Sequence, residues 1–175
     1  MDSSNSKDKS SNDYRDLFDN IIDSVAILDR DGNILDVNSA MIELSGYTRE
    51  EMLRMNVKQV VSPPDIEISR KYFIKLKEEG SYKGYSGGII DKQGNYKHVE
   101  ISSKAFYNES GDIIGSRDII RDITEKKRIE EKLIDSELKF RTIVTNSEAI
   151  IFILDKNGIF TLSEGRRVGE CQKKG

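Results

Sequence analysis

The sequence predicts an α+β domain in which an antiparallel sheet carries short helices on one face. Two short β-prone runs come first, at residues 24–29 and 34–37, with an Asp-Gly turn between them. Short helical patterns follow over residues 38–80, and from residue 82 onward the apolar residues recur at every second position. Two strands, several helices and three further strands in this order are typical of an α+β layer arrangement.

The first two strands are predicted to form a hairpin. Asp31-Gly32 lies between Ser24–Asp29 and Ile34–Val37, and such a turn needs the positive φ that glycine adopts at little cost. Before the hairpin, apolar residues at spacings of three and four predict one face of a short helix: Tyr14, Leu17, Phe18, Ile21 and Ile22.

The helical middle part has clear start and stop signals. Asn38 can accept hydrogen bonds from the first backbone N–H groups of a helix, and Gly46 can end that helix. Thr48-Arg49-Glu50-Glu51 has the spacing of a capping box and predicts the start of another helix. Pro63-Pro64 breaks the chain before a longer helix, which Gly80 is expected to end.

Three longer strands are predicted over Tyr82–Asp91, Asn95–Tyr107 and Asp112–Ile123. Glycine-containing turns connect them. In the middle strand, Val99 and Ile101 share one face and identify it as the side that packs against the core.

A charged helix is predicted over residues 125–145. Its apolar residues follow alternating spacings of four and three, with Ser136 as a polar interruption, which is a heptad pattern: Ile129, Leu133, Phe140 and Ile143. A short charged helix is marginally stable alone in water, so this pattern predicts a partner surface, most simply a second copy of the chain. The basic run Lys126-Lys127-Arg128 fits either a phosphate-binding patch or ion pairs with the following glutamates at i,i+4, and the second interpretation is favoured.

The chain then repeats its own beginning. Residues 141–158 match residues 15–32 at a constant offset, including Arg, Asn, Ile-Leu-Asp and Gly. We therefore expect an incomplete second unit over residues 146–163 and a polar tail over residues 164–175. Residues 1–12, rich in Ser, Asn, Asp and Lys, are expected to be disordered.

Composition narrows the classes of function. The chain has 175 residues, 34% charged and 36% hydrophobic, with a formal net charge of −3, which does not indicate a nucleic-acid binder. No apolar run approaches the roughly 20 residues that cross a bilayer, and the start has no apolar signal segment. The single cysteine, Cys171, fits a reducing compartment, so a cytoplasmic location is expected.

The order of these motifs resembles the PAS sensory domain. The resemblance rests on Ala-Ile-Leu-Asp-Arg-Asp-Gly-Asn-Ile at 26–34, Val-Asn-Ser-Ala at 37–40, Ser-Gly-Tyr-Thr-Arg-Glu-Glu at 45–51, Gly-Asn-Tyr-Lys-His-Val-Glu at 94–100, Gly-Asp-Ile-Ile-Gly at 111–115 and Asp-Ile-Thr at 122–124. It covers residues 13–124 as one PAS domain and resumes over the second unit.

The resemblance implies a PAS-like five-stranded antiparallel sheet in the order 2-1-5-4-3, with short helices that enclose a small pocket and a connector helix after the sheet. It also implies that Asp122 and Thr124 form a junction that ties the sheet to the connector helix. PAS domains sense ligands, light or redox state, or mediate dimerisation, and tandem units of this kind are common in sensor histidine kinases. A kinase or another output domain outside this chain is thus an expected partner.

The resemblance gives no indication of a known cofactor. The flavin-reactive cysteine of light-sensing versions has no counterpart around residues 45–49, and residues 69–79 have no haem histidine. His98 is interpreted as an ordinary strand histidine, and no metal site is expected. No nucleophile–base arrangement or phosphate-binding loop is recognisable, so the chain is not expected to be an enzyme.

Two functions remain open. In the first, a small unidentified ligand occupies the pocket and the change is relayed to the connector helix of a homodimer. In the second, the interior is filled by its own side chains and the chain is a ligand-free homodimerisation scaffold. The residues expected at the pocket are Met41, Leu44, Leu53, Val60, Tyr72, Phe73, Leu76, Val99, Ile101 and Ile119.

Overall fold

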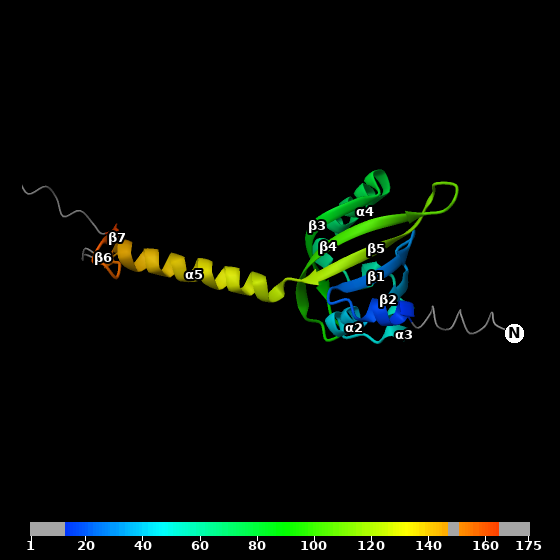
Figure 1. The fold of residues 1–175 in the computed structure, drawn as a ribbon, viewed down its shortest axis with the longest axis horizontal. Coiled ribbons are helices and arrows are strands. Elements are labelled where there is room, and N and C mark those ends of the chain that lie inside the picture. Colours follow the sequence, from blue (N-terminus) through cyan, green and yellow to red (C-terminus); the bar gives the residue numbers. More distant parts are fainter. Residues whose placement is uncertain (1–12, 147–150, 165–175) are drawn as a thin grey trace, which may run out of the picture. The chain divides into compact units, whose positions relative to one another are not determined.

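The computed structural model describes residues 13–146 and 151–164, which fall into two compact units, one ending at Glu125 and one beginning at Lys126 (Figure 1). The expected disorder of residues 1–12 and most of the expected tail lie outside the described residues. Residues 13–19 form a helix, and the elements after it are β1 (Ser24–Asp29), β2 (Ile34–Val37), α2 (Ser39–Ser45), α3 (Arg49–Met52), the 3₁₀ turns η1 (Val57–Gln59) and η2 (Pro63–Asp65), α4 (Ile66–Glu79), β3 (Ser81–Ile90), β4 (Tyr96–Tyr107), β5 (Ile113–Asp122), α5 (Thr124–Asn146), β6 (Ile151–Leu154) and β7 (Phe160–Glu164).

The first unit is built on a five-stranded antiparallel sheet in the order β2-β1-β5-β4-β3. The last strand of the unit, β5, lies at the centre and pairs with both β1 and β4. The sheet is therefore completed only when β5 is in place. The α+β class and the strand order expected from the resemblance are confirmed.

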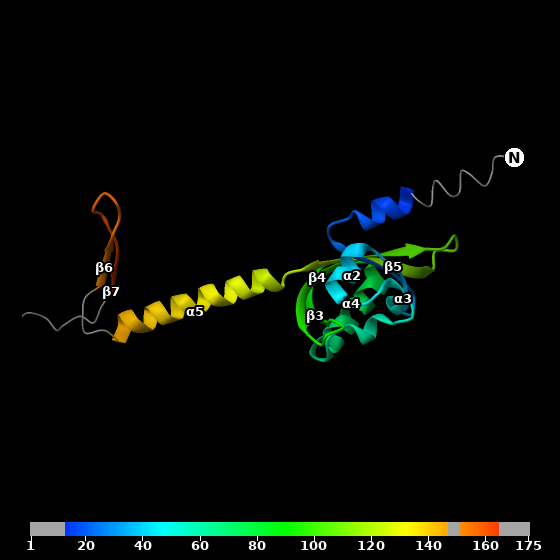
Figure 2. The ribbon, with the colours of Figure 1, turned by 90° about the horizontal axis from the view of Figure 1, so that it is seen from below.

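The helices between β2 and β3 form a layer on one face of the sheet, and the helix of residues 13–19 lies on the other side (Figure 2). The predicted caps of the layer are present. Asn38 accepts from the N–H of Met41, Thr48 and Glu51 form a reciprocal capping box, and Gly46 and Gly80 end their helices with φ values of 72° and 73°.

The core lies between the sheet and this helical layer. Its central residues are buried side chains from both layers: Ala26, Leu28, Ile34, Val37, Met41, Leu44, Met52, Ile89, Val99 and Ile120. The alternation expected in the middle strand is observed, since Val99 is fully buried and Ile101 packs against the same cluster.

Backbone hydrogen bonds tie the irregular segments of the layer to the sheet. The N–H of Ser62 donates to the carbonyl of Gly88 at 2.9 Å, and that of Ile90 to the carbonyl of Val60 at 2.8 Å. Gly88 has no room for a side chain, because a Cβ there would lie 2.2 Å from ring atoms of Tyr96. The ring of Tyr96 therefore occupies the space that a side chain at position 88 would need.

The second unit consists of α5 from Lys126 onward and an antiparallel hairpin of β6 and β7. The turn between β6 and β7 has the same hydrogen bonding as the turn between β1 and β2. In both, the glycine N–H donates to the carbonyl of an aspartate three residues earlier, at 3.1 Å for Gly32 and 3.0 Å for Gly158. The repeat in the sequence therefore corresponds to a repeated local structure.

Candidate functional site

The structure brings some of the predicted pocket residues together and separates others. Met41, Leu44 and Val99 belong to the core cluster, Ile101 packs against it, and Val60 and Leu76 are also buried. Leu53, Phe73 and Ile119 have 39%, 38% and 43% of their surface exposed and do not line the interior. Tyr72 stacks on Tyr85, with ring centroids 4.4 Å apart.

Side chains fill the centre of the core. Met52, Val37 and Val99 are the largest apolar side chains that are completely buried, and the buried Met41 and Leu44 belong to the same cluster. Such close packing is the state expected of an interior without a ligand. A role of these residues in ligand binding stays a prediction.

A polar cluster that was not predicted from the sequence lies on the inner face of the sheet, on β3, β4 and the central strand β5. Asp118 of β5 is the register partner of Ser103 of β4, and the Ser103 hydroxyl donates to its carboxylate at 2.5 Å. The Ser116 hydroxyl lies near the Asp118 carboxylate and helps to lower its pKa against the larger, raising effect of burial, and Ser103 does the same for Tyr82. The alternation of Ser116, Asp118 and Ile120 in β5, with Ile120 buried, was the available signal.

Burial changes the acid–base properties of this cluster. Asp118 is half-buried by area, but the atoms packed around its carboxyl raise the pKa of that group, and the serine hydrogen bonds offset this only in part. Desolvation likewise raises the pKa of Tyr85 to about 12 and shifts the pKa of Tyr82 further upward. Tyr82 of this cluster and Tyr85, on the same strand, are therefore neutral at ordinary pH.

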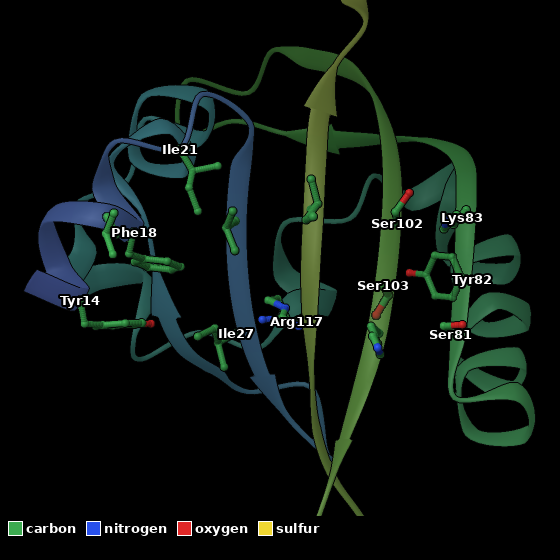
Figure 3. Close-up of a pocket in the computed structure, with 14 residues that line it drawn as sticks. Tyr14, Phe18, Ile21, Ile27, Ser81, Tyr82, Lys83, Ser102, Ser103 and Arg117 are labelled. Carbon is green, nitrogen blue, oxygen red and sulfur yellow. The ribbon is translucent and has the colours of Figure 1, made fainter.

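A groove of about 710 Å³ lies on the other face of the sheet, between the helix of residues 13–19 and the outer strands (Figure 3). We call it the outer-face groove. Tyr14 and Phe18 of the helix line the groove together with Ile21, which follows the helix (Figure 3). Ile27 of β1 and Ile119 of β5 line it from the sheet. Ile119, predicted for the interior, points to this face because it alternates with the buried Ile120.

The helix beside this groove is anchored by a pair of arginines. Arg15 and Arg49 both donate to the Asp36 carboxylate, Arg15 Nη2 at 3.0 Å and Arg49 Nη2 at 2.5 Å. Partial burial alone would raise the pKa of Asp36, but the hydrogen bonds from Arg15 and Arg49 hold it below its usual value. Asp36 therefore joins the helix of residues 13–19 to β2 and α3 as a charged group.

The junction residues lie where the sheet passes into α5. The Thr124 hydroxyl is 3.0 Å from the N–H and 3.4 Å from the carbonyl oxygen of His98, and the Asp122 carboxylate accepts from the N–H of Thr124 at 2.8 Å. The N–H of Ile123 also donates to the His98 carbonyl at 2.9 Å. Thr124, the first residue of α5, thus binds the backbone of β4.

The predicted heptad residues of α5 form an exposed stripe. Ile129, Leu133, Phe140 and Ile143 are exposed by 45% to 67% of their surface, and we call them the α5 stripe. On the same helix, Lys127 forms an ion pair with Glu130 at 3.2 Å, at a spacing of i,i+3 and not the expected i,i+4.

No group of three or more His, Cys, Asp or Glu side chains suited to a metal ion occurs among the described residues. His98 makes an edge contact with Tyr96, with centroids 4.8 Å apart. None of the helices in the described part of the chain combines the length and the apolar character needed to cross a membrane.

The sheet order, the helical layer and the sheet-to-helix junction define an α+β domain built on a five-stranded antiparallel sheet. A family model described as the PAS fold matches residues 12–123. The chain belongs to the PAS family.

This chain is similar to parts of longer proteins, among them a sensor and a kinase. It is 32% identical over 123 residues to a methyl sulfide methyltransferase-associated sensor of Methanosarcina acetivorans, covering 70% of this chain and 12% of the relative. It is 26% identical over 141 residues to sporulation kinase E of Bacillus subtilis, covering 79% of this chain and 18% of that kinase. The chain therefore spans less than a fifth of either relative.

Solved structures agree with the family assignment. The PAS domain of a protein from Colwellia psychrerythraea superposes with a TM-score of 0.61 at 26% identity, covering 66% of this chain and 98% of that domain. A PAS domain from a two-component sensor histidine kinase superposes with a TM-score of 0.57 at 17% identity, covering 66% of this chain and 98% of that domain, and this likeness concerns the fold alone.

Proposed function

We propose that this chain is the sensory part of a larger signalling protein, such as a histidine kinase, and that it passes a change in the PAS core to α5. The observation that supports this most directly is the junction, where the Thr124 hydroxyl binds both backbone groups of His98. A shift of β4 relative to β5 would break these bonds at the first residue of α5. Similarity to a sporulation kinase and to a sensor protein supports the same class of function.

The relay requires a partner that responds to α5. We propose a parallel homodimer that buries the α5 stripe, because a charged helix with an exposed apolar stripe gains stability mainly by packing. The output domain belongs to the larger protein, and a cytoplasmic location follows from the expected reducing environment. No nucleic-acid contact is part of this proposal.

The proposed relay can be tested by changing a residue of the core and measuring the effect on α5. Met41→Leu conserves volume in the core, far along the chain from the junction. We expect it to shift amide NMR signals in α5 of the otherwise unchanged protein, and to shift them much less when combined with Thr124→Val. Thr124→Ser, which keeps the hydroxyl, is the matched control and should preserve the communication. Equal α5 shifts with valine and serine at position 124 would contradict the relay.

The ligand-free scaffold is the second candidate function, and the packed centre of the core favours it. Met52, Val37 and Val99 are fully buried among side chains, which leaves little need for a ligand to fill the interior. Native mass spectrometry separates the two functions. A scaffold gives a dimer that releases no small molecule on denaturation, whereas a ligand sensor purified with its ligand loses that extra mass.

A further inference from the structure

A second groove, on the helical side of the domain, does not belong to the core or to the junction. It lies between α4, the turn connecting β1 and β2, and η1, and has a volume of about 400 Å³. Its apolar lining consists of Val57, Val61, Ile66 and Phe73. Ile66 and Phe73 keep 42% and 38% of their surface exposed, so the groove presents apolar surface to water in a concave place.

Cationic side chains surround this apolar lining. Arg30, Lys58, Arg70 and Lys77 all line the groove, and Asp31 is the one acidic side chain of the lining. The chain as a whole carries a formal charge of −3, so this concentration of positive charge is local. We call the site the basic groove.

The ion pairs near these cations leave them able to bind an anion. Arg30 is 3.8 Å from Asp31, and Arg70 is 3.8 Å from Glu67, and both pairs are largely exposed. Exposed pairs of this length contribute little and exchange easily for a better partner. The Lys77 ammonium lies 4.5 Å from the centre of the Phe73 ring, so a cation is already placed against the apolar lining.

The walls of the basic groove are held by bonds that need no ligand. The N–H of Val57 donates to the Gly32 carbonyl at 2.9 Å, and the Asn56 amide donates to the Asp31 carbonyl at 3.1 Å. On the other side, Val61 forms a β-bridge with Ile89 of β3. A groove built in advance saves a ligand the cost of ordering its site.

We propose that the basic groove binds a small amphipathic carboxylate, a negatively charged head on an aliphatic body. The apolar lining fits the aliphatic body of the ligand, because the bound body would remove the exposed faces of Ile66 and Phe73 from water. The four cations fit the head by charge complementarity, and the volume lies within the range of small-molecule sites. The site is independent of the relay through α5 and of whatever fills the core.

Decanoate is a suitable probe, at concentrations where it stays monomeric. We expect saturable binding by calorimetry, with NMR shifts of Ile66 and Phe73 side chains. Decanol lacks the charge and butyrate lacks most of the body, so both should bind at least about tenfold more weakly. Raising the salt concentration should weaken decanoate binding, because the cations are exposed to solvent.

Two double variants, each of which removes two lysine charges from the protein, test whether the basic groove is the binding site. Lys58→Gln with Lys77→Gln should weaken decanoate binding about tenfold, because two of the four cations that attract the carboxylate are removed. Lys71→Gln with Lys75→Gln alters α4 outside the groove and should leave the affinity unchanged.

Three results would overturn the proposal: no saturable binding, equal affinity in both double variants, or ligand shifts centred on Met41 and Val99. None of them depends on the state of the α5 stripe. A failure here would therefore leave the proposed relay and dimer untouched.

Discussion

At the scale of single residues, Asn38 connects three segments of the fold. It is fully buried, and its side-chain oxygen accepts from the N–H groups of Val25 and Met41 at 2.9 and 3.0 Å. Its side-chain nitrogen donates to the carbonyls of Ile21 and Asp23 at 3.2 and 3.0 Å. One amide thus caps α2 and also holds β1 and the segment that leads into it.

Replacing Asn38 by alanine should therefore cost more than the loss of a helix cap. We expect the free energy of unfolding to fall by about 3 kcal/mol, because buried backbone donors and acceptors lose their partner, whereas a cap alone contributes about 1 kcal/mol. Urea denaturation measures the difference. Asn20→Ala removes an exposed side-chain bond to the Asp16 carbonyl and should change stability by less than about 0.5 kcal/mol. A loss of only cap size in Asn38→Ala would show that the other bonds contribute nothing.

Asp118 gives the fold a pH-dependent weakness. Its pKa is raised by burial, so the folded protein holds this proton more tightly than the unfolded chain does. Stability from this group is therefore complete below the unfolded pKa of about 3.9, and it falls as the pH rises from there through the folded pKa. The groups around the carboxyl are the hydroxyls of Ser103 and Ser116 and the tyrosine Tyr82, whose raised pKa keeps it neutral over this range.

Asp118→Asn should accordingly stabilise the protein at neutral pH. The amide keeps an acceptor for Ser103 and removes the buried charge, so the gain over the unchanged protein should shrink as the pH is lowered toward about 4. Denaturant unfolding at several pH values measures this. Asp16→Asn makes the same charge change on an exposed helix position and should show little effect at any pH. A gain that is equal at all pH values would speak against a raised Asp118 pKa.

At the scale of elements, three hairpin turns share the same pattern of hydrogen bonds. In the turns that begin at Asp29, Asp91 and Asp155, the carboxylate accepts from the N–H groups two and four residues later. A glycine with positive φ follows three residues after each aspartate. The register of each hairpin is set by this local pattern, because the turn determines which residues of the two strands face each other.

The proposed role of the α5 stripe in dimerisation can be distinguished from that of other exposed apolar residues of the same helix. Leu133 and Ile134 are 59% and 57% exposed and adjacent in sequence, but only Leu133 belongs to the α5 stripe. Leu133→Asp should convert the proposed dimer to monomer in light scattering, because a carboxylate would be buried at the helix seam. Ile134→Asp, with the same change of charge, should stay dimeric. Two variants with the same molar mass would contradict a seam along the α5 stripe.

At the scale of the whole molecule, the first unit contains everything that its fold requires. All four strand pairings and the core cluster lie before Glu125. The central strand β5 is the last element of the unit, so the sheet closes only when residues 113–122 are present.

A chain that ends at Glu125 should therefore fold by itself, with a free energy of unfolding within about 0.5 kcal/mol of the longer chain at a concentration where both are monomeric. A chain that ends at Asp112 lacks β5 and should be unfolded by circular dichroism. If the chain ending at Glu125 were unfolded as well, α5 and the second unit would be required for the fold.

Local features of this protein follow from its sequence. The capping roles of Asn38, Thr48 and Glu51 and the turn glycines depend on interactions within a few residues, and so does the start of the second hairpin. The strand order depends on long-range pairing, and it was available only through the family resemblance. What sequence periodicity could not decide is the face to which a residue points when apolar residues are adjacent, as with Ile119 and Ile120.

The tertiary structure decided the sites. In the folded protein, Ile119 lines the outer-face groove and Phe73 lines the basic groove. Asp118 lies beside Ser103 of the neighbouring strand. Each of these placements depends on contacts between segments that are distant in the sequence. Local propensity determines which elements form and where they end, whereas the packing of sheet against helices determines which side chains meet.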